Sequence, residues 1–201
     1  MKLEDRKIFL LYIFYSVIFL FLTTKHVSLD QIIWDYNQRD IESYIIIAKD
    51  FPYLTENSEI INKHIAQRFF VHYIIGATSQ ILNIEIFLTY KIFTYLFITI
   101  LIYLIYFLTN KFELNLSESI LFFSLFFFNP YTIRYSLFNP AQAHDLIYFI
   151  CGFYFAYGII TNNTKLYSLA SLFALLTRQT AISLIAASFI KIFTLKKNKF
   201  K

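Results

Sequence analysis

The most constraining feature of this sequence is a series of long apolar blocks, of which residues 86–108 form the clearest. A helix that crosses a bilayer needs about 20 mostly apolar residues. Hydrophobic residues make up 58% of the chain and charged residues only 15%, whereas a soluble domain carries about 25% charge. The sequence therefore excludes a soluble globular enzyme. It predicts an all-α, polytopic membrane helix bundle that forms a single membrane domain over residues 1–201.

A first span is predicted at residues 8–23, and the only long polar segment, residues 24–68, follows it. The block at 69–82 has 14 residues and includes several polar side chains, so it is either interfacial or a short span. We expect the remaining spans within 86–195, which gives about six in all. Their apolar blocks are 86–108, 119–131, 146–160, 166–177 and 180–195.

The placement of charge predicts the topology of these spans. Lys2, Arg6 and Lys7 precede the first apolar block, and lysines also close the chain between residues 191 and 201. Because cytoplasmic segments of membrane proteins are enriched in Lys and Arg, we expect both termini in the cytoplasm and residues 24–68 outside. Lys111 and Lys165 also lie inside if residues 69–82 do not cross. If residues 69–82 cross and residues 166–195 form one helix, six spans remain but the later loops swap sides. No basic patch outside the termini indicates a nucleic-acid partner.

The long polar segment contains the first group of candidate site residues. Asp40, Tyr44 and Ala48 recur every four residues, which places them on one face of a helix that Phe51-Pro52 would end. The isoleucines at 45–47 make this predicted helix apolar enough to lie on the bilayer surface.

A second helix is predicted after Ser58, on which His64, Arg68 and His72 form one stripe with Gln67 beside it. A guanidinium group can hold a phosphate through two parallel hydrogen bonds, so the stripe is a candidate phosphate site. The alternative is that Arg68 only reaches toward lipid headgroups and the histidines satisfy an interface.

The second group of candidate residues lies between later spans. Residues 129–145 contain two Asn-Pro turns and end in His144-Asp145, at the start of an apolar block. Asp145 is either a simple helix cap or, because it is ionisable at a membrane entrance, part of a functional site. Arg178 interrupts the apolar residues between Leu166 and Lys191. It needs a partner such as Asp145 or a bound phosphate, or else it marks a bend exposed to water.

The order of these motifs resembles the N-terminal part of the GT-C superfamily of integral-membrane glycosyltransferases, in its bacterial mannosyltransferase and aminoarabinose-transferase branch. The resemblance covers residues 8 to about 195. It rests on Asp40-x3-Tyr44-x3-Ala48 with Phe51-Pro52, His64-x2-Gln67-Arg68, the Asn-Pro turn before Asp145, and Thr177-Arg178-Gln179-Thr180.

The resemblance implies transfer of a sugar, with inversion, from a polyprenyl-phosphate carrier to a glycan, lipid or protein acceptor at the outer face of a bacterial inner membrane. It implies that Asp40 is the general base and that Asp145 is the second acidic residue, near the donor or a metal. Arg68, His64 and Arg178 would hold the carrier phosphate. Tyr44, Gln67 and His144 would support them, and a divalent metal ion beside Asp145 and His144 stays open.

Several alternatives remain at this point. Members of the superfamily usually have a longer chain, so this protein is a compact member, a fragment that works with a second membrane chain, or a truncated and inactive remnant. A non-catalytic membrane subunit of the same fold is a further alternative, in which Asp40 and Asp145 would be dispensable caps. A polysaccharide polymerase of another family would also combine several spans with one large external loop.

Overall fold

Every regular element in the described part of the chain is helical, as the sequence predicts. The computed structural model describes residues 2–23, 39–53, 68–129 and 132–199. Two single-turn 3₁₀ helices, η1 (Pro140–Gln142) and η2 (Gln179–Ala181), precede α9 and α11. The α-helices are α1 (Leu3–Thr23), α3 (Arg39–Lys49), α5 (Phe69–Leu82), α6 (Ile86–Lys111), α7 (Leu116–Phe127), α8 (Ile133–Phe138), α9 (Ala143–Ile160), α10 (Thr164–Thr177) and α11 (Ile182–Lys199).

Local signals in the sequence explain where several of these helices begin. Glu85 caps α6 by accepting hydrogen bonds from the backbone of Phe87 and Leu88. Asn115 and Glu118 form a reciprocal capping box at the start of α7. Such caps satisfy the free N–H groups in the first turn of a helix and stabilise it by about 1 kcal/mol. The caps thus fix the short connections between consecutive long helices.

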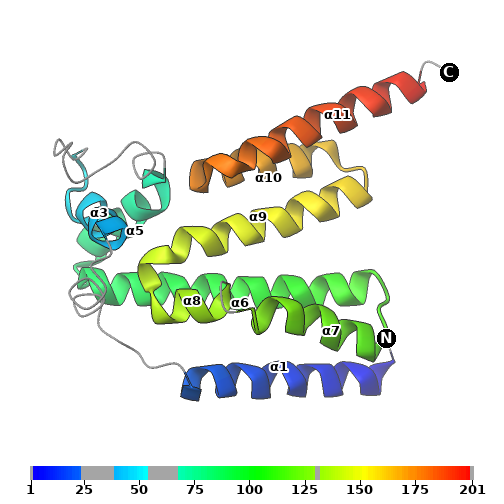
Figure 1. The fold of residues 1–201 in the computed structure, drawn as a ribbon, viewed down its shortest axis with the longest axis horizontal. Coiled ribbons are helices and arrows are strands. Elements are labelled where there is room, and N and C mark those ends of the chain that lie inside the picture. The colour runs from blue at the N-terminus through cyan, green and yellow to red at the C-terminus, as the bar shows by residue number, and fades with distance from the viewer. Residues whose placement is uncertain (1, 24–38, 54–67, 130–131, 200–201) are drawn as a thin grey trace.

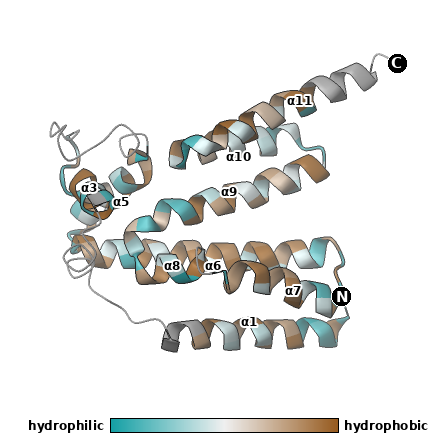
Figure 2. Ribbon diagram, viewed as in Figure 1, coloured by the Kyte–Doolittle hydropathy of each residue, from teal (hydrophilic) through white to brown (hydrophobic). Residues whose placement is uncertain are grey.

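The long helices run back and forth between the same two ends of the molecule (Figure 1). α1 and α7 lie on one side, α6 and α9 in the middle, and α10 and α11 on the other side, while α3 and α5 cover one end. The beginning of α1 and the end of α11 both lie at the opposite end. Polar residues gather near the two ends of the helices, and hydrophobic residues dominate their middle parts (Figure 2).

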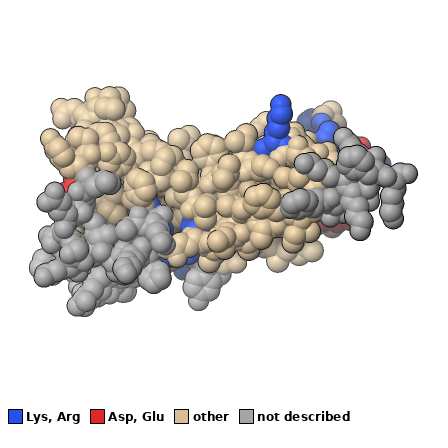
Figure 3. Space-filling view, turned by 90° about the horizontal axis from the view of Figure 1, so that it is seen from above, with Lys and Arg blue, Asp and Glu red and all other residues tan. Residues whose placement is uncertain are grey.

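Two helices in the described residues are long and apolar enough to cross a membrane, namely α6 and the continuous segment Pro140–Ile160. Only 39% and 33% of their apolar windows are buried inside the protein, so more than half of the residues in each window keep some surface that is not covered by protein. The space-filling view in Figure 3 also shows a surface on which few charged side chains appear. Shorter apolar helices accompany them, and α7 has 12 residues and α10 has 14. At 1.5 Å per residue these two are about 18 Å and 21 Å long, less than the roughly 30 Å of a bilayer core.

Two clusters of buried side chains hold the helices together. The larger one joins α1, α6, α7, α8 and α9, and includes Phe9, Leu101 and Phe123. The smaller one attaches α3 and α5 to α6 and to the start of α9. Ile45 and Ile47 of α3 are buried in it, so these isoleucines pack against protein. The smaller cluster therefore fixes the position of α3 and α5 at their end of the bundle.

α3 and α5 approach each other unusually closely at Gly76. A Cβ atom on this residue would lie 2.0 Å from the backbone oxygen of Ala48. Only glycine lets the two backbones come so near. This contact sets the distance between the helix that carries Tyr44 and the helix that carries His72 and begins directly after Arg68.

Candidate functional site

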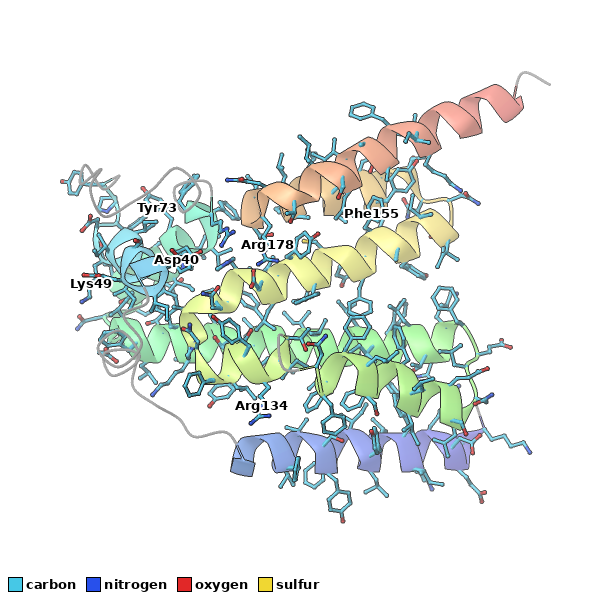
Figure 4. All side chains as sticks on the ribbon, in the orientation of Figure 1. Asp40, Lys49, Tyr73, Arg134, Phe155 and Arg178 are labelled. Atoms are coloured by element: carbon cyan, nitrogen blue, oxygen red, sulfur yellow. The ribbon has the colours of Figure 1, made fainter. Side chains whose placement is uncertain are left out.

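A cluster of polar side chains lies where α3, α5, α6 and the beginning of α9 meet the junction between α10 and α11 (Figure 4). Its members come from five separate segments of the sequence, yet each contacts at least one other member. We refer to them together as the polar cluster: Tyr44, Arg68, His72, Tyr90, His144, Asp145 and Arg178.

Tyr44 lies at the centre of the polar cluster. Its side chain is fully buried, and its ring stacks on that of His72 with the centroids 4.2 Å apart and the planes 11° from parallel. Arg68 Nη1 donates a hydrogen bond of 2.8 Å to the Tyr44 hydroxyl oxygen. Burial raises the pKa of this hydroxyl above its usual value, and the nearby Arg68 only partly offsets the effect. Tyr44 therefore remains protonated and can donate its own hydrogen to a bound group.

A chain of hydrogen bonds fixes the tautomer of His72. The Tyr90 hydroxyl donates to the backbone oxygen of Tyr44 over 2.9 Å, which uses its single hydrogen. The 2.9 Å contact between His72 Nδ1 and the Tyr90 oxygen must then have Nδ1–H as the donor. Neutral His72 consequently presents a bare Nε2 on the other side of the ring. This buried atom has no hydrogen-bond partner among the described residues.

His144 brings the start of α9 into contact with the stacked pair. Its ring meets Tyr44 edge-on with centroids 4.9 Å apart, and His72 with centroids 5.2 Å apart. Its Nε2 also lies 3.2 Å from Asp145 Oδ1. The imidazole therefore connects the aromatic half of the polar cluster to its charged half.

Asp145 and Arg178 form the charged half. Arg178 Nε lies 2.8 Å from Asp145 Oδ1, and the side chains are 34% and 13% exposed, respectively. Arg178 has an extended backbone between α10 and η2, so the helical break predicted around this residue is present. Its guanidinium also lies over the ring of Tyr148, 5.8 Å from the centroid. Asp145 is thus the partner that Arg178 requires.

Asp40 lies at the same end of the molecule, one turn before Tyr44 on α3, but its side chain is exposed (Figure 4). Its charge and those of Asp145 and Arg68 all act on the Tyr44 hydroxyl. The two aspartates are therefore gathered around one tyrosine. In the part of the chain that the structure describes, no hydrogen bond or ion pair connects Asp40 directly to Asp145.

Other predicted site residues have different outcomes. His64 and Gln67 lie outside the described residues. Within the described ranges, no group of three or more His, Cys, Asp and Glu side chains is arranged to hold a metal ion. Asp145 and His144 thus lack a third protein ligand of these types in that part of the chain.

Sequence reasoning did not identify Tyr90 or Tyr148 as members or neighbours of this site. Both lie within apolar helices of a chain with 16 tyrosines, so composition does not distinguish them from packing residues. The spacing along the chain places His72 in one stripe with Arg68, but it does not predict that the His72 ring stacks on Tyr44. Only the tertiary arrangement brings these rings together.

A comparison of the chain with protein-family models, curated proteins and solved structures found no match.

Proposed function

We propose that this protein is a membrane glycosyltransferase, or a part of one, that takes a sugar from a polyprenyl-phosphate carrier at the end of the bundle covered by α3 and α5. The observation that carries the proposal is the convergence of Arg68 and Arg178 on Asp145, beside the buried Tyr44, whose hydroxyl accepts a hydrogen bond from Arg68 and is also influenced by the charge of Asp40. Cationic forks suit the phosphate of a departing carrier, and a carboxylate suits the activation of an acceptor hydroxyl.

The proposed reaction assigns a role to each charged residue. The acceptor hydroxyl attacks the anomeric carbon of the sugar, and its proton passes to Asp40. The bond from that carbon to the phosphate oxygen breaks, and the phosphate leaves with the bonding electron pair. Arg68 and Arg178 stabilise the resulting negative charge, and Tyr44 donates a hydrogen bond to it. Asp145 orients Arg178 through their ion pair.

We further propose that α1, α6, α7, α9, α10 and α11 all cross the cytoplasmic membrane, which gives six spans with both termini inside. These helices alternate in direction between the two ends of the molecule. Lys2, Arg6 and Lys7 at the start of α1, Lys111 at the end of α6 and Lys165 at the start of α10 belong to the end opposite the polar cluster. By the positive-inside rule, this distribution of charge supports a polar cluster on the outer side.

A second candidate is a non-catalytic membrane subunit of the same fold. The Arg178–Asp145 pair and the Tyr44–Arg68 bond satisfy part of the polar cluster internally. In that case the cluster would only attach α3 and α5 to the bundle. The Asp40 side chain separates the two candidates, because it is exposed and a purely structural cluster does not need it.

The test is sugar transfer by the purified protein in lipid nanodiscs, with a panel of polyprenyl-phosphate-linked mannose, glucose and aminoarabinose as donors. Release of polyprenyl phosphate would be measured. We expect Asp40→Asn to lower the rate by about 10²–10⁴-fold, as loss of a general base does. Glu42→Gln is the matched control, since Glu42 is also exposed on α3 but points about 200° away from Asp40. Equal rates for the wild type and Asp40→Asn would contradict the proposal and favour the structural role.

A further inference from the structure

An apolar groove of about 500 Å³ runs along α9. Its walls come from the end of α6, from α7 and from the start of α11, and they are formed almost entirely by hydrophobic side chains. The groove follows α9 from Tyr148 to Ile160, which is about 18 Å at 1.5 Å per residue. A space of this shape and chemistry fits a single extended hydrocarbon chain.

One end of the groove adjoins the polar cluster. Tyr148 lines the groove and at the same time lies under the guanidinium of Arg178. Leu184, two residues after the beginning of α11, also lines the groove and packs against the same small buried cluster as Tyr148. A molecule with an anionic head at Arg178 would therefore have its apolar tail directed into the groove. Charge complementarity at one end and apolar lining along the rest indicate a lipid phosphate as the occupant.

Gly152 lies in the wall of this groove and differs from the other two glycines. A Cβ atom on Gly76 would lie 2.0 Å from the Ala48 backbone oxygen, and one on Gly158 would lie 2.8 Å from the Tyr167 backbone nitrogen. A Cβ atom on Gly152 would meet nothing within 4 Å. Helix packing thus explains Gly76 and Gly158, whereas at Gly152 the missing side chain leaves the groove open.

We propose that Gly152 is a specificity-determining residue: it keeps the groove open for the hydrocarbon chain of a lipid phosphate whose head lies at Arg178. The identity of the head depends on the proposed function, but the groove and Gly152 do not. Tyr148 and Gly152 are one helical turn apart, so a side chain at 152 would block the chain about 6 Å beyond Tyr148. Only the shortest chains would then still fit.

The test compares the affinities of inorganic phosphate, geranyl phosphate, farnesyl phosphate and farnesol for the purified protein in detergent, by calorimetry. The variants are Gly152→Leu, which fills the groove, and Tyr154→Leu, a control on α9 whose side chain is 39% exposed outside the groove lining. Leucine is a better helix former than glycine, so Gly152→Leu is expected to fold, and circular dichroism would check it.

We expect the wild type and Tyr154→Leu to bind farnesyl phosphate at least tenfold more tightly than inorganic phosphate. In Gly152→Leu this gain should disappear while binding of inorganic phosphate is unchanged. Persistence of the gain in Gly152→Leu would overturn the role of Gly152 and leave the proposed function intact. If no phosphate compound binds, the proposed function fails. Binding of farnesol that depends on Gly152 would then still support the groove as a site for a hydrocarbon chain. Absence of farnesol binding would overturn that role of the groove as well.

Discussion

The ring of Tyr44 stacks on the ring of His72 at a centroid distance of 4.2 Å, and this contact joins α3 to α5 within the polar cluster. Tyr44 has a second connection to His72, because the Tyr90 hydroxyl links the Nδ1 of His72 to the Tyr44 backbone oxygen. Its hydroxyl is left to contact Arg68. Because His72 and Tyr90 hold Tyr44 in place, the position of the Arg68 guanidinium depends on these two buried aromatic side chains, which carry no charge of their own.

The first prediction concerns the tautomer of His72. Nitrogen-15 NMR of histidine-labelled protein should show His72 in the Nδ1–H form, because Nδ1 must donate to Tyr90. Tyr90→Phe removes the acceptor, and His72 should then populate the Nε2–H form. Tyr106→Phe is a control on the same helix, away from the polar cluster. An Nε2–H signal assigned to His72 in the wild type would contradict this hydrogen-bond chain.

The second prediction concerns the Arg178–Asp145 pair. Arg178→Gln and Asp145→Asn should each lower the free energy of unfolding by about 1–3 kcal/mol, less than for a fully buried pair because Arg178 is 34% exposed. The double variant should be less destabilised than the sum of the two, since the interaction can be lost only once. Chemical denaturation in detergent would measure the free energy of unfolding of the wild type, the two single variants and the double variant. Strict additivity would mean that the pair contributes nothing to stability.

A third prediction follows from the close contact between α3 and α5. Gly76→Ala would place its Cβ 2.0 Å from the Ala48 backbone oxygen, so one backbone must move. Overpacking of this kind costs about 1–3 kcal/mol. Gly152→Ala has open space and serves as the matched control. Thermal unfolding should show a lower midpoint only for Gly76→Ala; similar midpoints for both variants would contradict the tight contact.

The fourth prediction concerns membrane topology. On a Cys151→Ser background, single cysteines replacing the exposed residues Tyr53 and Thr180 should react with a membrane-impermeant reagent added from outside. A cysteine replacing the exposed Thr164, at the opposite end of the bundle, should react only after the membrane is opened. Labelling of Thr164→Cys from outside, with protection of the other two, would invert the proposed orientation.

The sequence predicts the helical class and much of the helix placement, because hydrophobic blocks and capping residues act locally. The helix predicted around Asp40 and Tyr44 is present as α3, and the block at 69–82 forms α5. The number of membrane spans is not determined this way, since among the described residues α6 and the segment Pro140–Ile160 alone are both long enough and apolar enough to cross a membrane.

The candidate site shows where local reasoning stops. Arg178 requires a partner on energetic grounds, and Asp145 fulfils that requirement. The stacking of Tyr44 on His72 and the contact with His144 depend instead on how α3, α5 and α9 pack together. No spacing along the chain encodes such contacts, and in a sequence with 21% aromatic residues a single tyrosine carries little information.

The position of the Arg178–Asp145 pair has a consequence for the biogenesis of the protein. Asp145 lies in the first turn of α9 and Arg178 follows α10, so the two opposite charges lie at the same end of one antiparallel hairpin. Each charge alone would cost about 2.5–3.5 kcal/mol to move through the centre of a bilayer. If the hairpin leaves the translocon as a unit, the two charges can neutralise each other on the way. We therefore expect the ribosome to complete α10 before α9 settles in the membrane.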